Sequence, residues 1–214
     1  MPRHETCAWG FPSRDQWPVD DDVVAVGADL APDTLLYAYT HGMFPMHIDR
    51  KHETLGWFSP LSRGVIPIDG LHVTKSMRRS ARNFNVTSDM AFTDVMRYCA
   101  MTRTDGNWID DDFIESYSVL HAMGHANSVE VWNEDNQLVG GLYGVRVDRF
   151  FAGESMFHLE TDASKIALMY LVDMLRADGV VLLDTQWCTD HLASLGCVEV
   201  PRAEYLGLLD TALD

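Results

Sequence analysis

Residues 137–156 read QLVGGLYGVRVDRFFAGESM. Apolar and small residues fill both halves of this stretch, and Asp148-Arg149 between them has the composition of a tight turn. The preceding segment, Ser128 to Trp132, alternates in polarity and is followed by turn-forming residues at 133–136. We therefore predict three consecutive antiparallel strands, over residues 128–132, 137–147 and 150–156.

The chain after these strands continues the pattern. An amphipathic helix is expected over 162–178, opened by Thr161 or Asp162 and ended by Gly179. Val180 to Gln186 is almost continuously apolar, which is typical of a strand covered on both faces. A helix at 190–195, a strand near 198–200 and a terminal helix from Arg202 follow. This order resembles that of acetyltransferase-like domains, a likeness of fold that says nothing about chemistry.

The first third of the chain is different in composition. We predict a helix over 34–41 with Asp33 as its N-cap and Gly42 just after its end, then extended and loop-rich chain to Ile68, because prolines interrupt short aromatic and β-branched runs. Further helices are expected at 74–82, 88–102 and 110–123, the last capped by Asp110 or Asp111 and followed by Gly124. The predicted fold class is α+β, with a small N-terminal domain (1–60) and an acetyltransferase-like (GNAT-like) mixed-sheet domain (61–214).

The charge of the chain is strongly negative and unevenly distributed. Among 214 residues, 16 Lys and Arg stand against 32 Asp and Glu, a net charge of −16 that at first argues against a nucleic-acid partner. The window from Arg63 to Arg103 nevertheless carries a net +4, and the remainder −20. On a helix, four of its residues would form one stripe, at Lys75, Arg78, Arg79 and Arg82. The stripe is either a solvated face or a surface for phosphates, so the net charge does not exclude RNA.

The sequence gives no sign of export or of a membrane span. No apolar run approaches the roughly 18 residues that a spanning helix needs, and Met1 to Trp9 lacks the apolar centre of a secretory signal. The four cysteines form no CxxC pair and no dense framework. A reduced, cytoplasmic location is the expectation.

Three polar side chains lie at the ends of predicted strands. Asp184 and Gln186 are two residues apart, so their side chains share a face, and an acid beside Val181 to Leu183 is costly unless it is paired or functional. Glu154 lies near the end of the third strand. Together they either hold the sheet together or orient and deprotonate an amine nucleophile.

Two other patterns point to structure rather than chemistry. His121 and His125 have the spacing of a zinc pair, but no third ligand is evident, which favours capping or packing and predicts no metal. Gly140, Gly141 and Gly144 lie within a strand and predict a flat surface on which a ligand or another backbone segment can lie.

An ordered set of short motifs resembles one known family. They are GADL (27–30), LLYAY (35–39), GMFP (42–45), WFSP (57–60), WI (108–109), GGLYG (140–144), GESMF (153–157), ASK (163–165), DTQ (184–186) and HLASLG (191–196). In order and spacing they are similar to bacterial leucyl/phenylalanyl-tRNA–protein transferases, from about Gly27 to Leu209.

The resemblance implies an activity. Members transfer Leu or Phe, and Met less well, from aminoacyl-tRNA to the N-terminal Arg or Lys of acceptor proteins, which marks these for degradation by the N-degron pathway. No cofactor or metal is implied, and the pyrophosphate loop of coenzyme A-dependent acetyltransferases is absent between Met156 and Lys165. The implied partners are Leu- and Phe-charged tRNA and proteins with N-terminal Arg or Lys, with no membrane and the enzyme a monomer.

The resemblance also assigns residues. Asp184, Gln186 and Glu154 are the implied catalytic set, with Gln186 touching the amine or the carbonyl, Asp184 orienting Gln186, and Glu154 holding the cationic N-terminus. The implied side-chain pocket, shaped to accept Leu and Phe over Ile and Val, is lined by Leu142, Phe151, Met156 and Leu168. Trp108 and Met46 would contact the tRNA 3′ end, and the stripe Lys75, Arg78, Arg79 and Arg82 the tRNA body.

The sequence departs from the family at two positions. Ala28 replaces a glycine, and Met46 stands where the family has Trp. If that Trp packs on the 3′ adenosine, then a thioether contact from Met46, or a contact from His47 or Trp57, must replace it.

Two alternatives belong to other classes. An acyl-CoA-dependent N-acyltransferase is disfavoured by the missing pyrophosphate loop, and a non-catalytic RNA- or peptide-binding module by the three polar residues.

Overall fold

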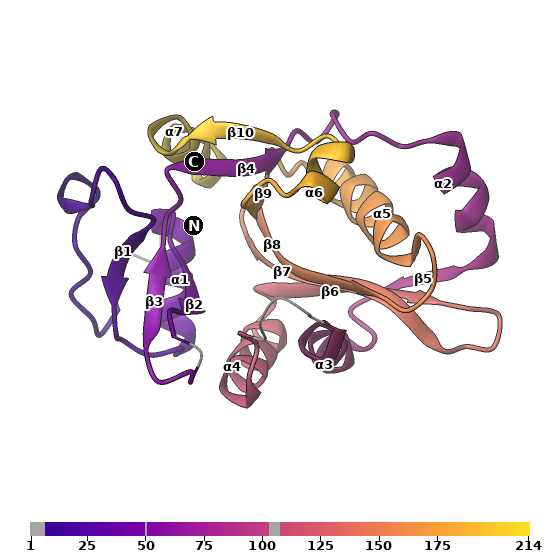
Figure 1. Ribbon diagram of the computed structural model, residues 1–214, viewed down its shortest axis with the longest axis horizontal. Coiled ribbons are helices and arrows are strands. Elements are labelled where there is room, and N and C mark those ends of the chain that lie inside the picture. The colour runs from indigo at the N-terminus through magenta and orange to yellow at the C-terminus, as the bar shows by residue number, and fades with distance from the viewer. Residues whose placement is uncertain (1–6, 50, 103–107) are drawn as a thin grey trace.

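The computed structural model describes residues 7–49, 51–102 and 108–214, which form two sheets with helices around them (Figure 1). The smaller sheet has the order β1-β3-β2 and is antiparallel throughout. Its strands are β1 (Val23–Val26), β2 (Phe44–His47) and β3 (Leu55–Phe58). Helix α1 (Pro32–His41) packs on β2.

The larger sheet has seven strands in the order β10-β4-β9-β8-β7-β6-β5. Their bounds are β4 (Ser62–Ile66), β5 (Asn85–Ser88), β6 (Ala126–Trp132), β7 (Leu138–Val147), β8 (Phe150–His158), β9 (Leu182–Gln186) and β10 (Val198–Pro201). Neighbouring strands are antiparallel except β8 and β9, which are parallel because α5 crosses between them. The predicted α+β class with a mixed sheet is confirmed.

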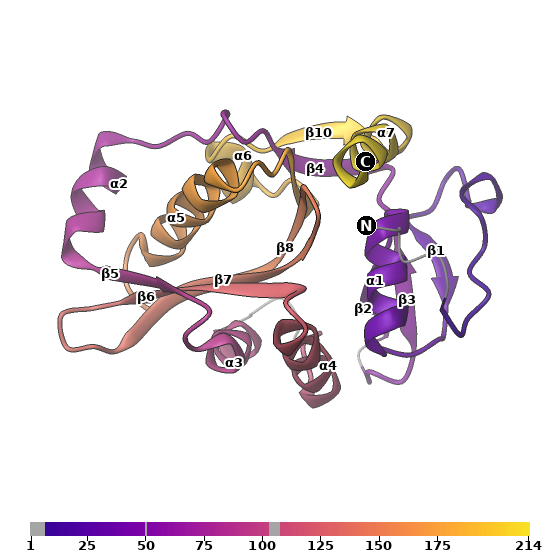
Figure 2. The same cartoon turned by 180° about the vertical axis from the view of Figure 1, so that it is seen from behind.

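Helices cover both faces of the larger sheet (Figures 1 and 2). On one face lie α3 (Phe92–Thr102) and α4 (Asp111–Ala122), and on the other lies α5 (Ala163–Ala177). The shorter α2 (Lys75–Ser80) and α6 (Asp190–Ser194) lie on the α5 side. Two single-turn 3₁₀ helices, Arg14–Gln16 and Ala81–Asn83, complete the described elements apart from α7. None of the described helices is long and apolar enough to cross a bilayer.

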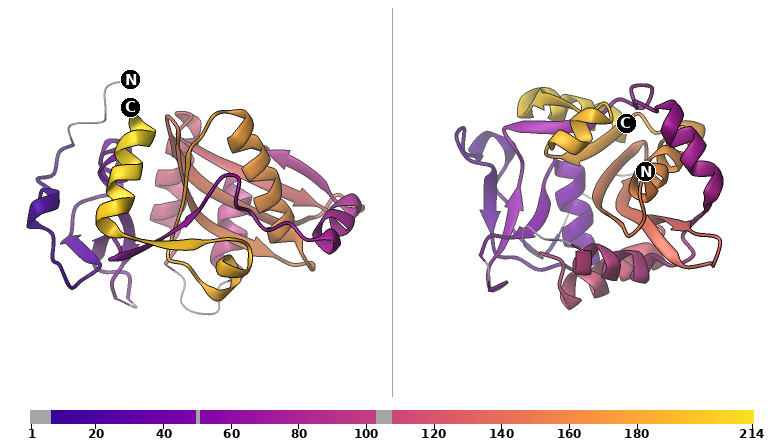
Figure 3. Two further views of the ribbon diagram at one scale, coloured as in Figure 1. Left: turned by 90° about the horizontal axis from the view of Figure 1, so that it is seen from above. Right: turned by 45° about the vertical axis from the view of Figure 1, so that its right-hand side comes forward.

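Helix α7 (Arg202–Leu213) joins the two sheets. It contacts α1 on one side and strands β4, β8, β9 and β10 on the other, and it stands between the two parts of the molecule in Figure 3. Tyr205 and Leu209 are fully buried in a core that also contains Leu35 and Leu36 of α1. One apolar cluster therefore runs from the small sheet into the large one.

The predicted elements are largely confirmed, with differences at their ends. The helix expected from residue 88 begins at Phe92, because Asn85–Ser88 pairs with β6 as an edge strand and Asp89 turns the chain in a left-handed conformation (φ 59°). The Asp33 N-cap is wrong: Ala31 caps α1 and Pro32 occupies its first turn, where proline is favoured. Asp110 and Gly124 flank α4 as predicted.

Gly140 shows why glycines interrupt β7. A Cβ atom at this position would lie 2.5 Å from the Cβ of Ala163 and 3.0 Å from its carbonyl carbon. The first turn of α5 therefore rests directly on the β7 backbone, which confirms the prediction that another backbone segment lies on this surface.

The close approach at Gly140 predicts a stability effect. Gly140→Ala should lower the free energy of unfolding by about 1–3 kcal/mol, because α5 must move away from the sheet. Gly207→Ala is the control: apart from its own helix backbone and chain neighbours, no atom of the described residues lies within 4 Å of the added Cβ, and alanine favours the helix. Chemical denaturation measures both, and equal stability of the two variants would contradict this account of the packing.

Candidate active site

A cavity of about 630 Å³ opens between β2 and the large sheet. Its wall is mainly apolar, with Glu154 and Gln186 among its polar members. Its lining includes Phe44, Met46, Trp108, Leu142, Glu154, Met156, Leu168, Gln186 and Trp187. Both sheets contribute to this wall.

The cavity forms where the parallel strands β8 and β9 separate. They pair over three residues only, ending at Ala152 opposite Asp184. Beyond that point Glu154 on β8 and Gln186 on β9 both face the cavity. Gln186 has a left-handed backbone (φ 60°), a conformation that costs a non-glycine residue free energy and often marks a functional site.

Asp184 is held by a buried ion pair with Arg63 of β4. The Arg63 Nε donates to Asp184 Oδ1 at 2.8 Å and Nη2 donates to Oδ2 at 2.6 Å, and both side chains are at most 1% exposed. The Tyr205 hydroxyl donates to Oδ2 at 2.8 Å, and the backbone N–H of Gln186 donates to Oδ1 at 2.9 Å. Asp184 is not among the residues that line the cavity, so it supports the site from behind.

Aromatic rings enclose the Arg63 guanidinium. Its carbon lies 4.7 Å from the centre of the Phe44 ring and 4.3 Å from that of Tyr205, and Nη1 donates to the Gly42 carbonyl at 3.3 Å. Burial lowers the pKa of Arg63, but the adjacent Asp184 carboxylate more than reverses this. The guanidinium therefore stays charged and ties α7, β2 and β9 together.

Glu154 lies at the other end of the same network. Gln186 Nε2 donates to Glu154 Oε1 at 3.0 Å, and the Tyr39 hydroxyl is also hydrogen-bonded to this carboxyl group. Tyr39 in turn contacts the Tyr117 hydroxyl at 2.5 Å. Burial raises the pKa of both tyrosines well above its usual value, so they remain neutral.

The environment of Glu154 favours its neutral form. Burial raises the pKa of this carboxyl to about 8, with help from the Asp184 carboxylate and against the effects of the Tyr39 hydrogen bond and Arg63. Glu154 is nevertheless 9% exposed and lines the cavity. The raised pKa contributes to the free energy of unfolding. This contribution is complete at acid pH, where the carboxyl is protonated in both states, and it is lost as the pH rises through about 8.

The apolar residues predicted for a side-chain pocket do not all reach the cavity. Leu142, Met156 and Leu168 line it, whereas Phe151 is fully buried and is not among its lining residues. Phe151 belongs to the core cluster that contains Leu142 and Leu168, so it supports the wall from behind.

Met46 and Trp108 line the same cavity. Trp57 is fully buried, with its indole N–H on the Gly27 carbonyl at 2.8 Å. His47 bonds to Asp110 through Nε2 at 2.9 Å. Of the three candidates to replace the family tryptophan, Met46 is the one with a side chain at the cavity surface.

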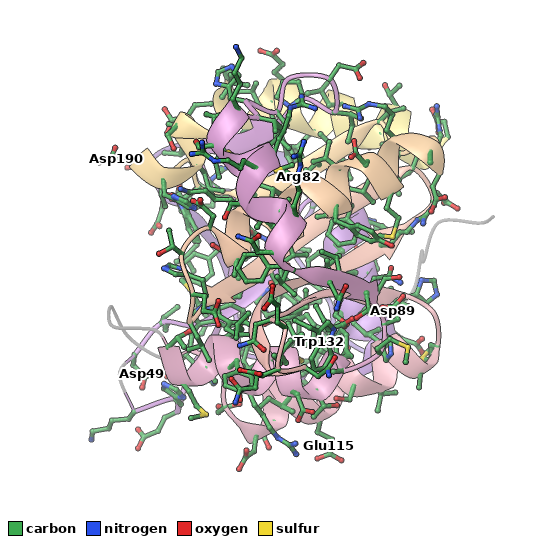
Figure 4. All side chains as sticks on the ribbon, turned by 90° about the vertical axis from the view of Figure 1, so that its right-hand side faces the viewer. Asp49, Arg82, Asp89, Glu115, Trp132 and Asp190 are labelled. Atoms are coloured by element: carbon green, nitrogen blue, oxygen red, sulfur yellow. The ribbon has the colours of Figure 1, made fainter. Side chains whose placement is uncertain are left out.

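The predicted basic stripe lies at the end of the molecule opposite the small sheet (Figure 1). Lys75, Arg78, Arg79 and Arg82 are all exposed. The single helix predicted for 74–82 is wrong at its end: α2 stops at Ser80, and Arg82 lies in the following 3₁₀ turn. Arg82 is labelled on this face in Figure 4.

Sequence reasoning missed several partners of the site. It counted Arg63 as part of a positive window, but its charge is buried against Asp184. No role in the site is predicted for Tyr39, Tyr117 or Tyr205, because tyrosines in a helix are typical of core residues. The cost of an acid within an apolar strand was the one signal that Asp184 required a buried cation.

The cavity combines an apolar wall with an amide and a buried carboxyl group, an arrangement that suits the transfer of an apolar acyl group. The family described as leucyl/phenylalanyl-tRNA protein transferase matches residues 65–210, and the N-terminal domain of the same family matches residues 28–61. The chain belongs to this family.

Individual relatives agree. The leucyl/phenylalanyl-tRNA–protein transferase of Pseudoalteromonas atlantica is 46% identical over 195 residues, covering 89% of this chain and 82% of the relative. That of Nitrobacter winogradskyi is 48% identical over 191 residues, covering 87% and 84%. Among solved structures, FemX shares the fold with a TM-score of 0.52 at 12% identity, over 79% of this chain and 66% of FemX.

The buried ion pair predicts an asymmetric mutational response. Arg63→Met should lower the free energy of unfolding by about 3–5 kcal/mol, because it leaves the Asp184 carboxylate buried without its partner. The double variant Arg63→Met/Asp184→Leu should lose less free energy of unfolding than the sum of the losses in the two single variants. Arg97→Met is the control, since its pair with Asp94 is exposed and should change stability by less than about 1 kcal/mol. Additive effects in urea denaturation would contradict the assigned pairing.

Proposed function

We propose that this protein transfers Leu or Phe, and Met less well, from aminoacyl-tRNA to the N-terminal Arg or Lys of acceptor proteins, marking them for the N-degron pathway. The observation that carries the proposal is the cavity in which Glu154 and Gln186 meet an apolar wall. Membership of the family supplies the identity of the substrates.

The transferred side chain occupies the apolar part of the cavity. Leu142, Met156 and Leu168 form an uncharged wall of branched aliphatic and thioether side chains. An unbranched Cβ passes between them, whereas the second Cβ substituent of Ile or Val meets the wall. Shape discrimination of this kind is worth about 1–3 kcal/mol.

The 3′ adenosine lies between Trp108 and Met46, which both line the cavity. An aromatic ring under a base contributes about 1–3 kcal/mol, and the Met46 thioether supplies an adaptable contact on the other side. The ester carbonyl then faces Gln186 and Glu154.

The reaction exchanges an ester for an amide and needs no external energy source. The α-amine of the acceptor attacks the ester carbonyl carbon, the new C–N bond forms, and the C–O bond to the tRNA ribose breaks with a proton going to the departing hydroxyl. Gln186 keeps one amide hydrogen on Glu154 and has a second for the developing oxyanion. Only the ionised form of Glu154, which a cationic N-terminus stabilises, can act as the base: it attracts the acceptor, takes the ammonium proton as the C–N bond forms, and passes that proton to the departing ribose hydroxyl.

Asp184 acts in this scheme as a positioning residue. Each of its oxygens already accepts two hydrogen bonds: Oδ1 from Arg63 and the Gln186 backbone, and Oδ2 from Arg63 and Tyr205. No lone pair is left for a substrate proton. The carboxylate instead stabilises the left-handed backbone of Gln186, and it acts on catalysis through that residue.

The tRNA body lies along the basic stripe at α2. Lys75, Arg78, Arg79 and Arg82 are exposed there, and the remaining negative surface repels phosphates from other orientations. We further propose that residues 1–60 and 61–214 are separate domains, that the protein is a monomer, and that it works in the cytoplasm where charged tRNA is found.

Glu154→Gln should abolish most of the transfer. The amide can still hydrogen-bond to Gln186 but cannot accept a proton, so kcat should fall by about 10²–10⁴ while binding of charged tRNA is unchanged. The assay follows labelled Leu or Phe from tRNA onto an Arg-starting peptide.

Glu115→Gln, an exposed change on α4 (Figure 4), is the matched control and should leave the rate unchanged. Full activity of Glu154→Gln would show that the carboxyl is structural. No transfer by the wild-type protein at any salt concentration, together with tight binding of acetyl-CoA, would favour a coenzyme A-dependent acyltransferase.

Charge reversal on α2 tests the docking of the tRNA body. Arg78→Glu should weaken tRNA binding several-fold at low salt and reduce the slope of log K against log salt by about 1, because one phosphate contact is lost. Arg97→Glu makes the same charge change on the exposed surface of α3 and should have a smaller effect. Equal losses in the two variants would indicate a response to net charge alone.

A further inference from the structure

Two histidines and an aspartate meet beside the start of α4. His47 ends β2, His52 follows it in the β2–β3 connection, and Asp110 is the N-cap of α4. Asp110 Oδ2 lies 2.9 Å from His47 Nε2 and 3.4 Å from His52 Nδ1. Sixty-three residues of chain separate His47 from Asp110, so only the fold brings them together.

The three groups are held in place by their surroundings. The imidazole rings of His47 and His52 are stacked, with centres 4.6 Å apart and an interplanar angle of 15°. The other oxygen of Asp110 accepts the backbone N–H of Phe113 at 3.0 Å, which fixes Oδ2 toward the histidines. The side chains are 11–28% exposed, so solvent reaches the cluster from one side.

The spacing suits a small tetrahedral ion. Zinc binds imidazole nitrogen and carboxylate oxygen at about 2.0–2.2 Å, which puts neighbouring ligand atoms about 3.3 Å apart. The observed separations of 2.9 and 3.4 Å lie on either side of that value, and all three ligand atoms lie within 4.8 Å of one another. One ion can contact all three once the stacked imidazole rings turn so that their in-plane lone pairs converge on it, and its fourth position is then open to water.

We propose that His47, His52 and Asp110 bind one divalent transition-metal ion of the zinc class. Two imidazoles and a carboxylate favour zinc, nickel or copper over magnesium and calcium, which prefer oxygen ligands. The sequence predicted no metal, and its only candidate pair was elsewhere: His121 packs on Phe92 and bonds to the Ala126 carbonyl.

The ion would join two separate parts of the chain at the cavity. His47 follows Met46, and Asp110 lies two residues after Trp108, both of which line the cavity. Coordination ties the β2–β3 connection to the start of α4 and so fixes the spacing between Met46 and Trp108. The role is that of a clamp, and it does not require the metal to touch the substrate.

Titration calorimetry of the chelator-treated full chain with Zn²⁺ tests the site. The wild-type protein should bind one ion that the His52→Ala variant binds at least tenfold more weakly, because one ligand of three is lost. Asp110→Asn should also weaken binding while it still caps α4, since asparagine is a good N-cap. His72→Ala removes an exposed histidine outside the cluster and should leave binding unchanged.

Co²⁺ provides a second, spectroscopic readout. The wild-type protein should show the visible absorption of low-coordinate cobalt, and His52→Ala should lose it. Identical Zn²⁺ affinity of the wild type, His52→Ala and Asp110→Asn would overturn the proposal and leave the cluster as an ion pair. These measurements use no tRNA and no transfer assay, so they succeed or fail independently of the proposed function.

Discussion

The buried pair of Arg63 and Asp184 is the interaction on which the rest of the site depends. Charges removed from water are tolerated only when each is fully paired. Here two hydrogen bonds join the groups, the Tyr205 hydroxyl donates a further one to Asp184, and the rings of Phe44 and Tyr205 enclose the guanidinium. The pair connects β4 with β9, and its neighbours Phe44 and Tyr205 come from β2 and α7. The relation between the two sheets therefore depends on the same contact that supports the cavity.

The chemistry at the cavity follows from this support. Asp184 has no free lone pair, so its effect passes to Gln186, whose left-handed backbone it stabilises and whose amide meets Glu154. Burial raises the pKa of Glu154 to about 8, which favours its neutral form in the free protein, whereas a cationic substrate would favour its ionised form. We propose that Glu154 ionises when an ammonium group arrives and then accepts its proton, so that two carboxylates are not held close together in the free protein.

The sequence predicts the fold well where one pattern dominates. The alternation before residue 156 and the apolar run over 180–186 predict the central strands. No strand is predicted over Asn85–Ser88, because a short polar edge strand has no apolar period, and Ser88 is assigned to the following helix. For the site, the cost of a buried acid singled out Asp184. Its partner Arg63 could not be identified, since 121 residues separate the two and a buried arginine cannot be distinguished from an exposed one by composition. The cluster of His47, His52 and Asp110 could not be predicted for the first of these reasons, because Asp110 lies far from the two histidines in the sequence.

The central claim is that the buried network holds Glu154 as a neutral acid ready to exchange a proton. Titration of its side-chain carboxyl by carbon NMR, with Glu154→Gln used to assign the resonance, measures this directly. A pKa near 8 in the free protein is the predicted result, and it should fall when a peptide with N-terminal Arg is bound. A pKa near 4.3, the ordinary value for glutamate, unchanged by the peptide, would contradict the account.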